Sequence, residues 1–145
     1  MAALTTAAIL ERFETVLQAP PCLLQPSANP FTETTVANVN VDTVYKLTAN
    51  GIISDRITSN FQSVRLERIG VCVYKAMQFD GYQAQREIQD LLDTIERAIV
   101  ADGPDQGYMA TLEKGSRKVT RPKGTDLCEA TLSFLVDYDF DESAS

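Results

Sequence analysis

The side chains that most often carry enzyme chemistry are scarce in this sequence. It contains no histidine, which removes the commonest general base, the commonest metal ligand and any Ser-His or Cys-His nucleophile pair. Cys22, Cys72 and Cys128 lack CxxC spacing, and we expect them to be free thiols buried in the fold. Neither a P-loop nor a GxGxxG pattern occurs. The sequence therefore predicts no catalytic residue, no metal site and no cofactor, and indicates a protein that is not an enzyme.

Two clusters of charged residues remain as candidates for binding. Asp137, Asp139, Asp141 and Glu142 alternate near the end of the chain and could hold a hard cation, although a solvated strand edge is the simpler interpretation. The second cluster lies in the polar segment 114–126, and its basic residues are Lys114, Arg117, Lys118, Arg121 and Lys123. We interpret this segment either as a solvated hairpin tip or as an arm that docks on an acidic surface, a partner subunit or a phosphate backbone.

The composition is that of one folded domain. The chain has 145 residues, of which 44% are hydrophobic and 23% charged, and we expect a single domain over residues 1–145 with a frayed acidic tail at 141–145. The net charge of −7 argues against a protein whose main function is to wrap nucleic acid. There is no basic leader and no apolar run of about 20 residues, so we expect a soluble protein that is kept in a cytoplasm and has no membrane contact.

Two long patterns predict the elements that must position these residues. In Leu127–Phe140 apolar residues recur at every second position, as in a half-buried strand. At about 3.3 Å per residue this strand would be about 45 Å long, so we expect it to bend or to pass from one neighbour to another. Residues 80–101 predict an amphipathic helix, with Asp80 as its N-cap and Asp102-Gly103-Pro104 as its end. We expect this helix and the last strand to form the core.

The remaining segments complete the prediction of an α+β fold. Residues 4–18 predict a helix capped by Thr5 or Thr6, and residues 20–31 an extended connector. Residues 32–61 indicate one or two strands with a tight turn at Asn50 and Gly51. Residues 62–77 predict a long strand, and residues 108–113 a short strand that pairs with the last one. We expect a mainly antiparallel sheet of four to five strands, covered on one face by two helices, with an extended β-hairpin near the C-terminus.

The outer face of the predicted strands is polar but largely uncharged at Thr111, Thr131 and Ser133. Such a face is compatible with contacts between subunits, and equally with an ordinary solvated sheet.

Several segments, taken in order, resemble the tail terminator (tail completion) proteins of tailed bacteriophages. They are RLERIGVCVYKAM, QREIQDLLDTIERAI, GYMATLE and CEATLSFLVDYDFDE, and the opening helix ILERFETVL fits the same layout. Residues 20–61 depart from the family, because they are longer than the two short strands that it places there. The resemblance implies a virion structural protein that forms a homohexameric ring on the head-proximal end of the tail tube, ends tube polymerisation and joins the tail to the head.

The resemblance also implies the partners. They would be further copies of this chain, the tail tube protein and the head-side connector protein, with genomic DNA passing through an acidic lumen without specific binding. The protein would lie in the neck or upper tail of the virion after assembly in the bacterial host cytoplasm. The basic residues of segment 114–126 would lie at a subunit or tube contact.

Two alternatives stay open. One is another neck or tail component, such as a head-tail stopper or a tube-related subunit. The other is a small adaptor that binds nucleic acid or an acidic protein through the basic residues of segment 114–126.

Overall fold

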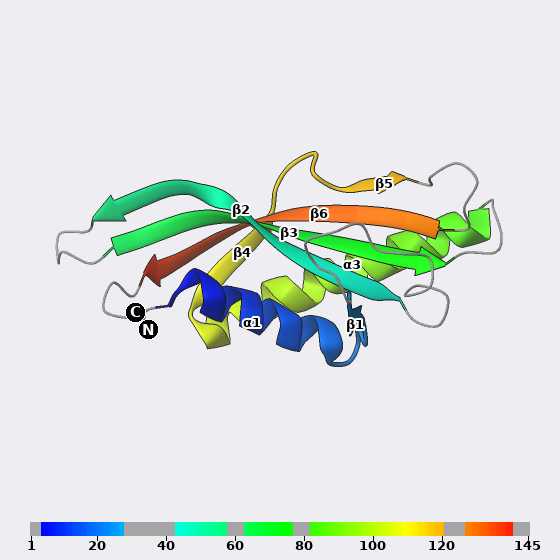
Figure 1. The fold of residues 1–145 in the computed structure, drawn as a ribbon, viewed down its shortest axis with the longest axis horizontal. Helices are drawn as coiled ribbons and strands as arrows, with labels where there is room; N and C mark the ends of the chain where they lie inside the picture. Colours follow the sequence, from blue (N-terminus) through cyan, green and yellow to red (C-terminus); the bar gives the residue numbers. More distant parts are fainter. Residues whose placement is uncertain (1–3, 28–42, 58–62, 77–81, 121–126, 141–145) are drawn as a thin grey trace.

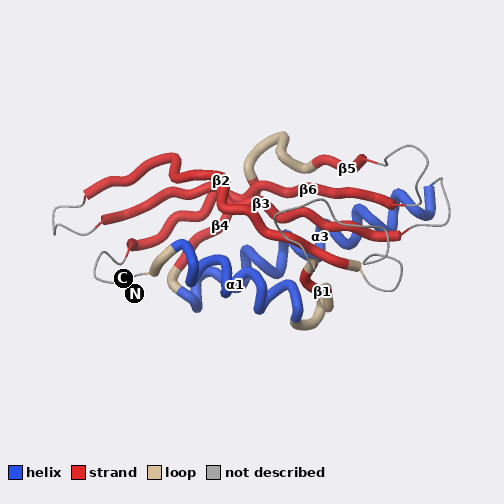
Figure 2. The backbone as a smooth tube through the Cα atoms, in the orientation of Figure 1, coloured by secondary structure: helices blue, strands red, loops and turns tan. Residues whose placement is uncertain are grey.

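The protein is built on one β-sheet with helices over one of its faces. The computed structural model describes residues 4–27, 43–57, 63–76, 82–120 and 127–140. The elements in chain order are α1 (Thr6–Gln18), β1 (Gln25–Pro26), β2 (Val44–Ile57), β3 (Ser63–Ala76), α3 (Tyr82–Gln106), β4 (Tyr108–Leu112), β5 (Lys118–Thr120) and β6 (Leu127–Phe140). Figure 1 shows α1 and α3 on the same side of the sheet, and Figure 2 shows the separate layers of helix and strand. The predicted α+β class is confirmed.

The sheet has the order β1-β2-β3-β6-β4, with β5 also beside β6. All pairs are antiparallel except β1 with β2. One side of β6 pairs with β3 along its whole length, while the other side pairs first with β5 and then with β4. The expectation that this long strand passes from one neighbour to another is therefore confirmed, and β4 pairs antiparallel with β6 as expected. The connection between them was predicted as a polar loop at an extended tip, but its residues Lys118–Thr120 pair with β6, and residues 121–126 lie outside the described residues.

The core lies between the sheet and the helices. Odd-numbered residues of β3 and even-numbered residues of β6 point to the helices, because side chains alternate along a strand. The Phe13 ring of α1 lies 6.0 Å from that of Phe134 at 90°, an edge-to-face contact. The predicted packing of the second helix on the last strand is confirmed by the core residues Ile88, Leu92, Ile95 and Ile99 of α3 and Ala130, Leu132, Phe134 and Val136 of β6.

The first helix follows its sequence signals closely. Thr5 is the N-cap, and its hydroxyl accepts a hydrogen bond from the Ala8 N–H at 3.2 Å. The helix ends at Gln18 with Ala19 as its C-cap, and the Pro20 and Pro21 that predicted this end follow. Local signals are therefore enough to predict this helix.

The predicted end of the second helix is wrong. α3 continues through Gly103 and Pro104 to Gln106, and Gly107 follows with a φ of +88°. A Cβ on Gly103 would lie 2.5 Å from the Tyr108 carbonyl oxygen, so only glycine lets this turn pass so close to β4. Asp102 fixes the same turn by accepting hydrogen bonds from Arg12 and Tyr108. These contacts outweigh the helix penalties of glycine and proline. The predicted N-cap, Asp80, lies outside the described residues.

The predicted turn at Asn50 and Gly51 is also wrong, because both residues lie within the single strand β2. The register against β3 shifts between Ala49 and Ile52 and again between Ile52 and Ser54, and Gly51 has a φ of +114°. Glycine there accommodates a bulged strand instead of a hairpin. The short strands β1 and β5 lie in segments predicted as a connector and a loop, and they bring the number of described strands to six, above the four to five that we expected.

Candidate interaction surface

Both described helices lie over the same face of the sheet, and we call the opposite face, which neither of them covers, the open face (Figure 1). It is a mixture of apolar, uncharged polar and a few charged side chains, most of them half-buried. Its members on the two central strands are Val64, Leu66, Arg68, Gly70, Cys72 and Tyr74 of β3 and Glu129, Thr131, Ser133, Leu135, Asp137 and Asp139 of β6. Thr131 and Ser133, whose uncharged character the sequence predicted, lie near the middle of β6 on this face, whereas the charged Glu129, Asp137 and Asp139 lie toward its ends.

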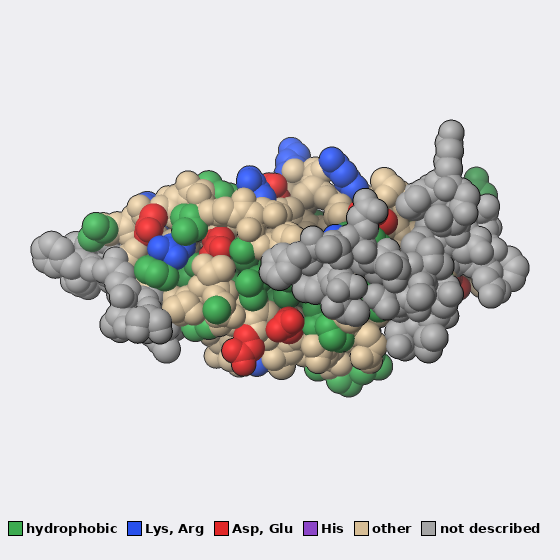
Figure 3. Space-filling view, viewed as in Figure 1, with side chains coloured by type: hydrophobic (Ala, Val, Ile, Leu, Met, Phe, Trp, Pro, Cys, Tyr) green, Lys and Arg blue, Asp and Glu red, His purple; other side chains and the backbone are tan. Residues whose placement is uncertain are grey.

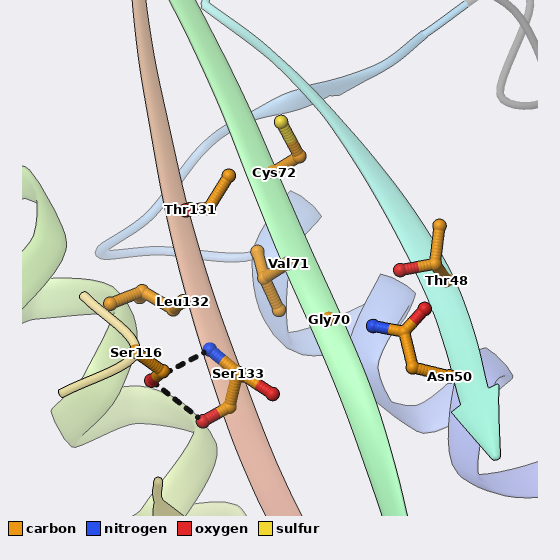
Figure 4. Close-up of a pocket in the computed structure, with 9 residues that line it drawn as sticks. All are labelled: Thr48, Asn50, Gly70, Val71, Cys72, Ser116, Thr131, Leu132 and Ser133. Atoms are coloured by element: carbon orange, nitrogen blue, oxygen red, sulfur yellow. Dashed lines mark hydrogen bonds between the residues drawn. The ribbon is translucent and has the colours of Figure 1, made fainter. Parts of the chain in front are cut away.

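A small hollow lies near the middle of the open face (Figure 4). Gly70 leaves room there, since a Cβ at this position would lie 2.7 Å from the Thr48 hydroxyl oxygen. The Ser116 hydroxyl donates to the Ser133 carbonyl and accepts from the Ser133 N–H, both at 3.2 Å. The hollow has a volume of about 150 Å³. That is smaller than the roughly 300–1,000 Å³ of a typical substrate pocket, but it could accept a side-chain tip.

The described residues contain no cluster of possible metal ligands. No three or more cysteine, aspartate or glutamate side chains among them lie close enough together to hold a metal ion. Burial raises the pKa of the Cys22 and Cys72 thiols, which makes them poor nucleophiles. None of the three cysteines forms a disulfide; Cys22 and Cys128 are buried and Cys72 is half-buried. Of the acidic cluster at the chain end, Asp137 is exposed and Asp139 half-buried, while Asp141 and Glu142 lie outside the described residues.

The buried carboxylate of Glu67 has a structural role. Its side chain is 3% exposed, and its Oε1 accepts hydrogen bonds from the Tyr138 hydroxyl at 2.6 Å and the Thr6 hydroxyl at 2.8 Å. Burial and the bond to Glu67 raise the pKa of Tyr138. The start of α1 is thus fastened to β3 and β6. No pattern in the sequence pointed to this contact, because its members are far apart in the chain.

The described part of segment 114–126, together with Glu113, forms a strap (residues 113–120) that runs along β6 from the end of β4 through β5. The strap is anchored at its start, where Arg68 forms an ion pair with Glu113 at 2.7 Å. It is anchored again at Arg117, whose guanidinium lies 2.6 Å from Asp93 and donates to the Gln89 carbonyl at 3.0 Å on α3. This contact with Arg117 lowers the pKa of Asp93.

The predicted basic cluster therefore divides into two kinds of residue. Arg117 is engaged within the chain, whereas Lys114 and Lys118 are exposed and form no ion pair with any described residue. Arg121 and Lys123 lie outside the described residues. Figure 3 shows Lys and Arg side chains along the upper margin of the molecule, over the strap.

Comparisons with known proteins assign no family. No protein family model matches the chain, and no curated protein matches it. Among solved structures, a chain from the virion of a native gene transfer agent particle is similar at 15% sequence identity, over 92% of each chain, with a TM-score of 0.49. None of the described helices is long and apolar enough to cross a membrane.

Proposed function

We propose that this protein is a non-enzymatic virion structural protein, a tail terminator that forms a homohexameric ring on the head-proximal end of a tail tube. In that position it would end tube polymerisation and join the tail to the head-side connector. The observation that carries the proposal is the open face of the sheet. The sequence resemblance to tail terminators supplies the particular role.

The composition of the open face favours a protein contact over solvent. A solvated face of an antiparallel sheet usually carries polar and charged residues at the outward positions. Here those positions include Leu66 and Leu135, both half-buried, and the uncharged Thr131 and Ser133. The charge of Arg68 is paired with Glu113. A mixed face with few unpaired charges is typical of surfaces that contact other subunits.

The charge of the chain suits a passage for DNA. Each subunit carries a net charge of −7, so a ring of several copies would repel a phosphate backbone. Such a ring would let DNA pass without binding it.

The basic residues then fall into two roles. Arg117 positions the strap by its contact with Asp93, while Lys114 and Lys118, together with Arg121 and Lys123, are proposed to contact the tube or the next subunit. The double change Lys114→Gln and Lys118→Gln should therefore weaken assembly and leave the monomer folded. Arg86→Gln with Arg97→Gln is a matched control, because it removes the same charge from exposed sites on α3.

Native mass spectrometry with negative-stain imaging over a concentration series tests the ring. Purified tubes are then mixed with the protein and their lengths are measured. Six-fold rings with a central hole, or capped tubes that no longer grow, are the expected results. A stable dimer, or tubes that grow unchanged in the presence of excess protein, would contradict the proposal.

The same experiments separate the neighbouring roles. A tube-related subunit would be incorporated along the tube, and a head-tail stopper would bind the connector without stopping tube growth. The exposed Lys114 and Lys118 also fit an adaptor for nucleic acid or an acidic protein. In that case binding to DNA would be lost steeply with added salt.

A further inference from the structure

In the half of the sheet that contains β4, neither edge is paired with a described strand. In the part that contains β4, the strands lie in the order β2, β3, β6, β4, and no described strand pairs with the outer side of β4 or with residues 49–57 of β2. The two unpaired edges lie opposite each other across the sheet, so residues of β4 and β2 fall in the same rows. One row across the sheet consists of Tyr108, Tyr138, Arg65 and Asp55, and another of Leu112, Phe134, Ile69 and Ala49.

The two edges are also complementary in direction. Each of the pairs β2–β3, β3–β6 and β6–β4 is antiparallel, so β2 and β4 run in opposite directions. A second copy placed beside the first in the same orientation therefore brings its β2 antiparallel to β4 of the first copy. The helices of both copies then stay on the same face. Such a contact joins different surfaces of the two copies. Repeated from copy to copy, it closes into a ring if the rotations add up to one full turn without a rise along the axis.

β4 carries none of the side chains that usually protect an edge strand. Its residues include no charged residue and no proline, and Met109 is 65% exposed. The Glu113 N–H donates to the Ser133 carbonyl of β6 at 2.8 Å. Because hydrogen-bonding direction alternates along an antiparallel strand, the N–H and C=O groups of Ala110 and Leu112 point away from β6. No hydrogen bond from another described residue is recorded for them, so they can pair with another strand.

The facing part of β2 matches this edge. Ile53 is 46% exposed, and pairing with β3 is regular from residue 54 to residue 57, beyond the bulges. The charges are opposite on the two sides. Arg56 lies at the β2 edge and exposed Asp137 lies beside Met109, and neither has an ion-pair partner among the described residues.

We propose that β4 of one copy pairs antiparallel with residues 49–57 of β2 in a second copy, so that the sheet continues from subunit to subunit. The proposal rests on the proposed function, because it names the subunit contact of that ring. In this arrangement the β4 edge of each copy pairs with the β2 edge of the next identical copy.

Cross-linking tests the contact directly. Met109 lies in one row with Asp137, Leu66 and Ser54, so continuing the sheet without a shift sets Met109 beside Ser54 of the next copy on the open face. We would introduce Met109→Cys and Ser54→Cys in a Cys72→Ala background and add a short bis-maleimide. A ladder of covalent multimers is expected. The control pair is Met109→Cys with Lys46→Cys, because Lys46 lies in the other half of the sheet, in the row of Lys118.

Charge variants give a second, independent test. Met109→Lys should block the β4 edge, and Ile53→Lys the β2 edge, so each variant alone should lose assembly while its circular dichroism spectrum is unchanged. A mixture of the two retains one intact edge on each variant. It should form heterodimers and nothing larger, a result that simple destabilisation does not produce.

The outcomes separate this inference from the proposed function. If rings form but the Met109 and Ser54 positions do not cross-link, or cross-link no better than the control pair, the edge contact is wrong and the ring function stands. If the ladder forms without closed rings or tube capping, the edge contact stands and the terminator function is wrong. Absence of any cross-link at the highest soluble concentration overturns the edge contact.

Discussion

Replacing Asp102 should test how the last turn of α3 is held. Its Oδ1 and Oδ2 accept hydrogen bonds from Arg12 at 2.8 and 2.9 Å, and Oδ2 also accepts one from the Tyr108 hydroxyl at 2.9 Å. One carboxylate thus joins α1, α3 and β4. Burial and the neighbouring Asp102 carboxylate raise the pKa of Tyr108, so the hydroxyl stays protonated and donates.

The expected loss in the free energy of unfolding follows from how far each partner of Asp102 is buried. Tyr108 is 2% exposed, and a hydrogen bond from such a group to a carboxylate contributes about 1.5–3 kcal/mol. The Arg12 side chain is 33% exposed, so its ion pair adds about 0.2–1 kcal/mol. The Tyr108 hydroxyl also lies 3.2 Å from the Ile99 carbonyl, and it can turn to that acceptor. We therefore expect Asp102→Ala to lower the free energy of unfolding by about 2–3 kcal/mol. This value lies toward the lower end of the sum of the two contributions, because the Tyr108 hydroxyl keeps the Ile99 carbonyl as an acceptor.

Urea unfolding of dilute protein at pH 7, followed by circular dichroism, would measure this loss. A double-mutant cycle with Tyr108→Phe separates the hydrogen bond from the ion pair. We expect a coupling free energy above about 1 kcal/mol between Asp102 and Tyr108. The hydrogen bond between Asp102 and Tyr108 would be refuted if the losses of the two single variants add up to that of the double variant within about 0.5 kcal/mol. A loss below about 0.5 kcal/mol for Asp102→Ala alone would refute the stabilising role of Asp102.

Two further predictions concern the same helix. Gly103→Ala should lower stability by more than about 1 kcal/mol, although helix propensity alone predicts a gain of about that size, because the new Cβ meets the Tyr108 carbonyl oxygen. Urea unfolding would measure it, with Gln85→Ala at an exposed site of α3 as a near-neutral control; a stabilised Gly103→Ala protein would contradict the close approach. Because contact with Arg117 lowers the pKa of Asp93, the strap's anchor should be intact above the ordinary aspartate pKa and be lost as pH falls through the lower, folded value. Amide exchange in β5, corrected for its intrinsic pH dependence, should show this loss, and Asp93→Asn should abolish the transition; an unchanged pH profile in that variant would rule out Asp93 as the titrating group.

The elements that sequence predicted correctly are those set by local periodicity. The apolar stripe of α3 and the alternation of β6 each fix a buried face without reference to distant partners. The errors occur where a distant contact decides. Gly103 and Pro104 predict a helix end, yet α3 continues through them, because the hydrogen bond between Tyr108 and Asp102 holds the last turn of the helix in place. Asn50 and Gly51 read as a turn, but pairing with β3 turns them into a bulge.

The candidate surface was predictable in part for the same reason. The uncharged outer positions of β6 are visible in the sequence, so the open face could be anticipated. The anchoring of Arg117 on Asp93 could not, because it joins residues on separate elements. The alignment of the two open edges depends on the bulges of β2, whose local signal at Asn50 and Gly51 predicts a hairpin turn equally well.

The pairing of β3 with β6 also has a mechanical consequence. The two strands run antiparallel in continuous register, from Ser63 opposite Phe140 to Ala76 opposite Leu127. A force that pulls the two strands past each other acts in shear, so many backbone hydrogen bonds must break together before the strands slide. A force that peels one strand from the end breaks them one at a time. The central pair of the sheet is therefore stiffest along its length, the direction in which it would transmit tension through an assembly of these subunits.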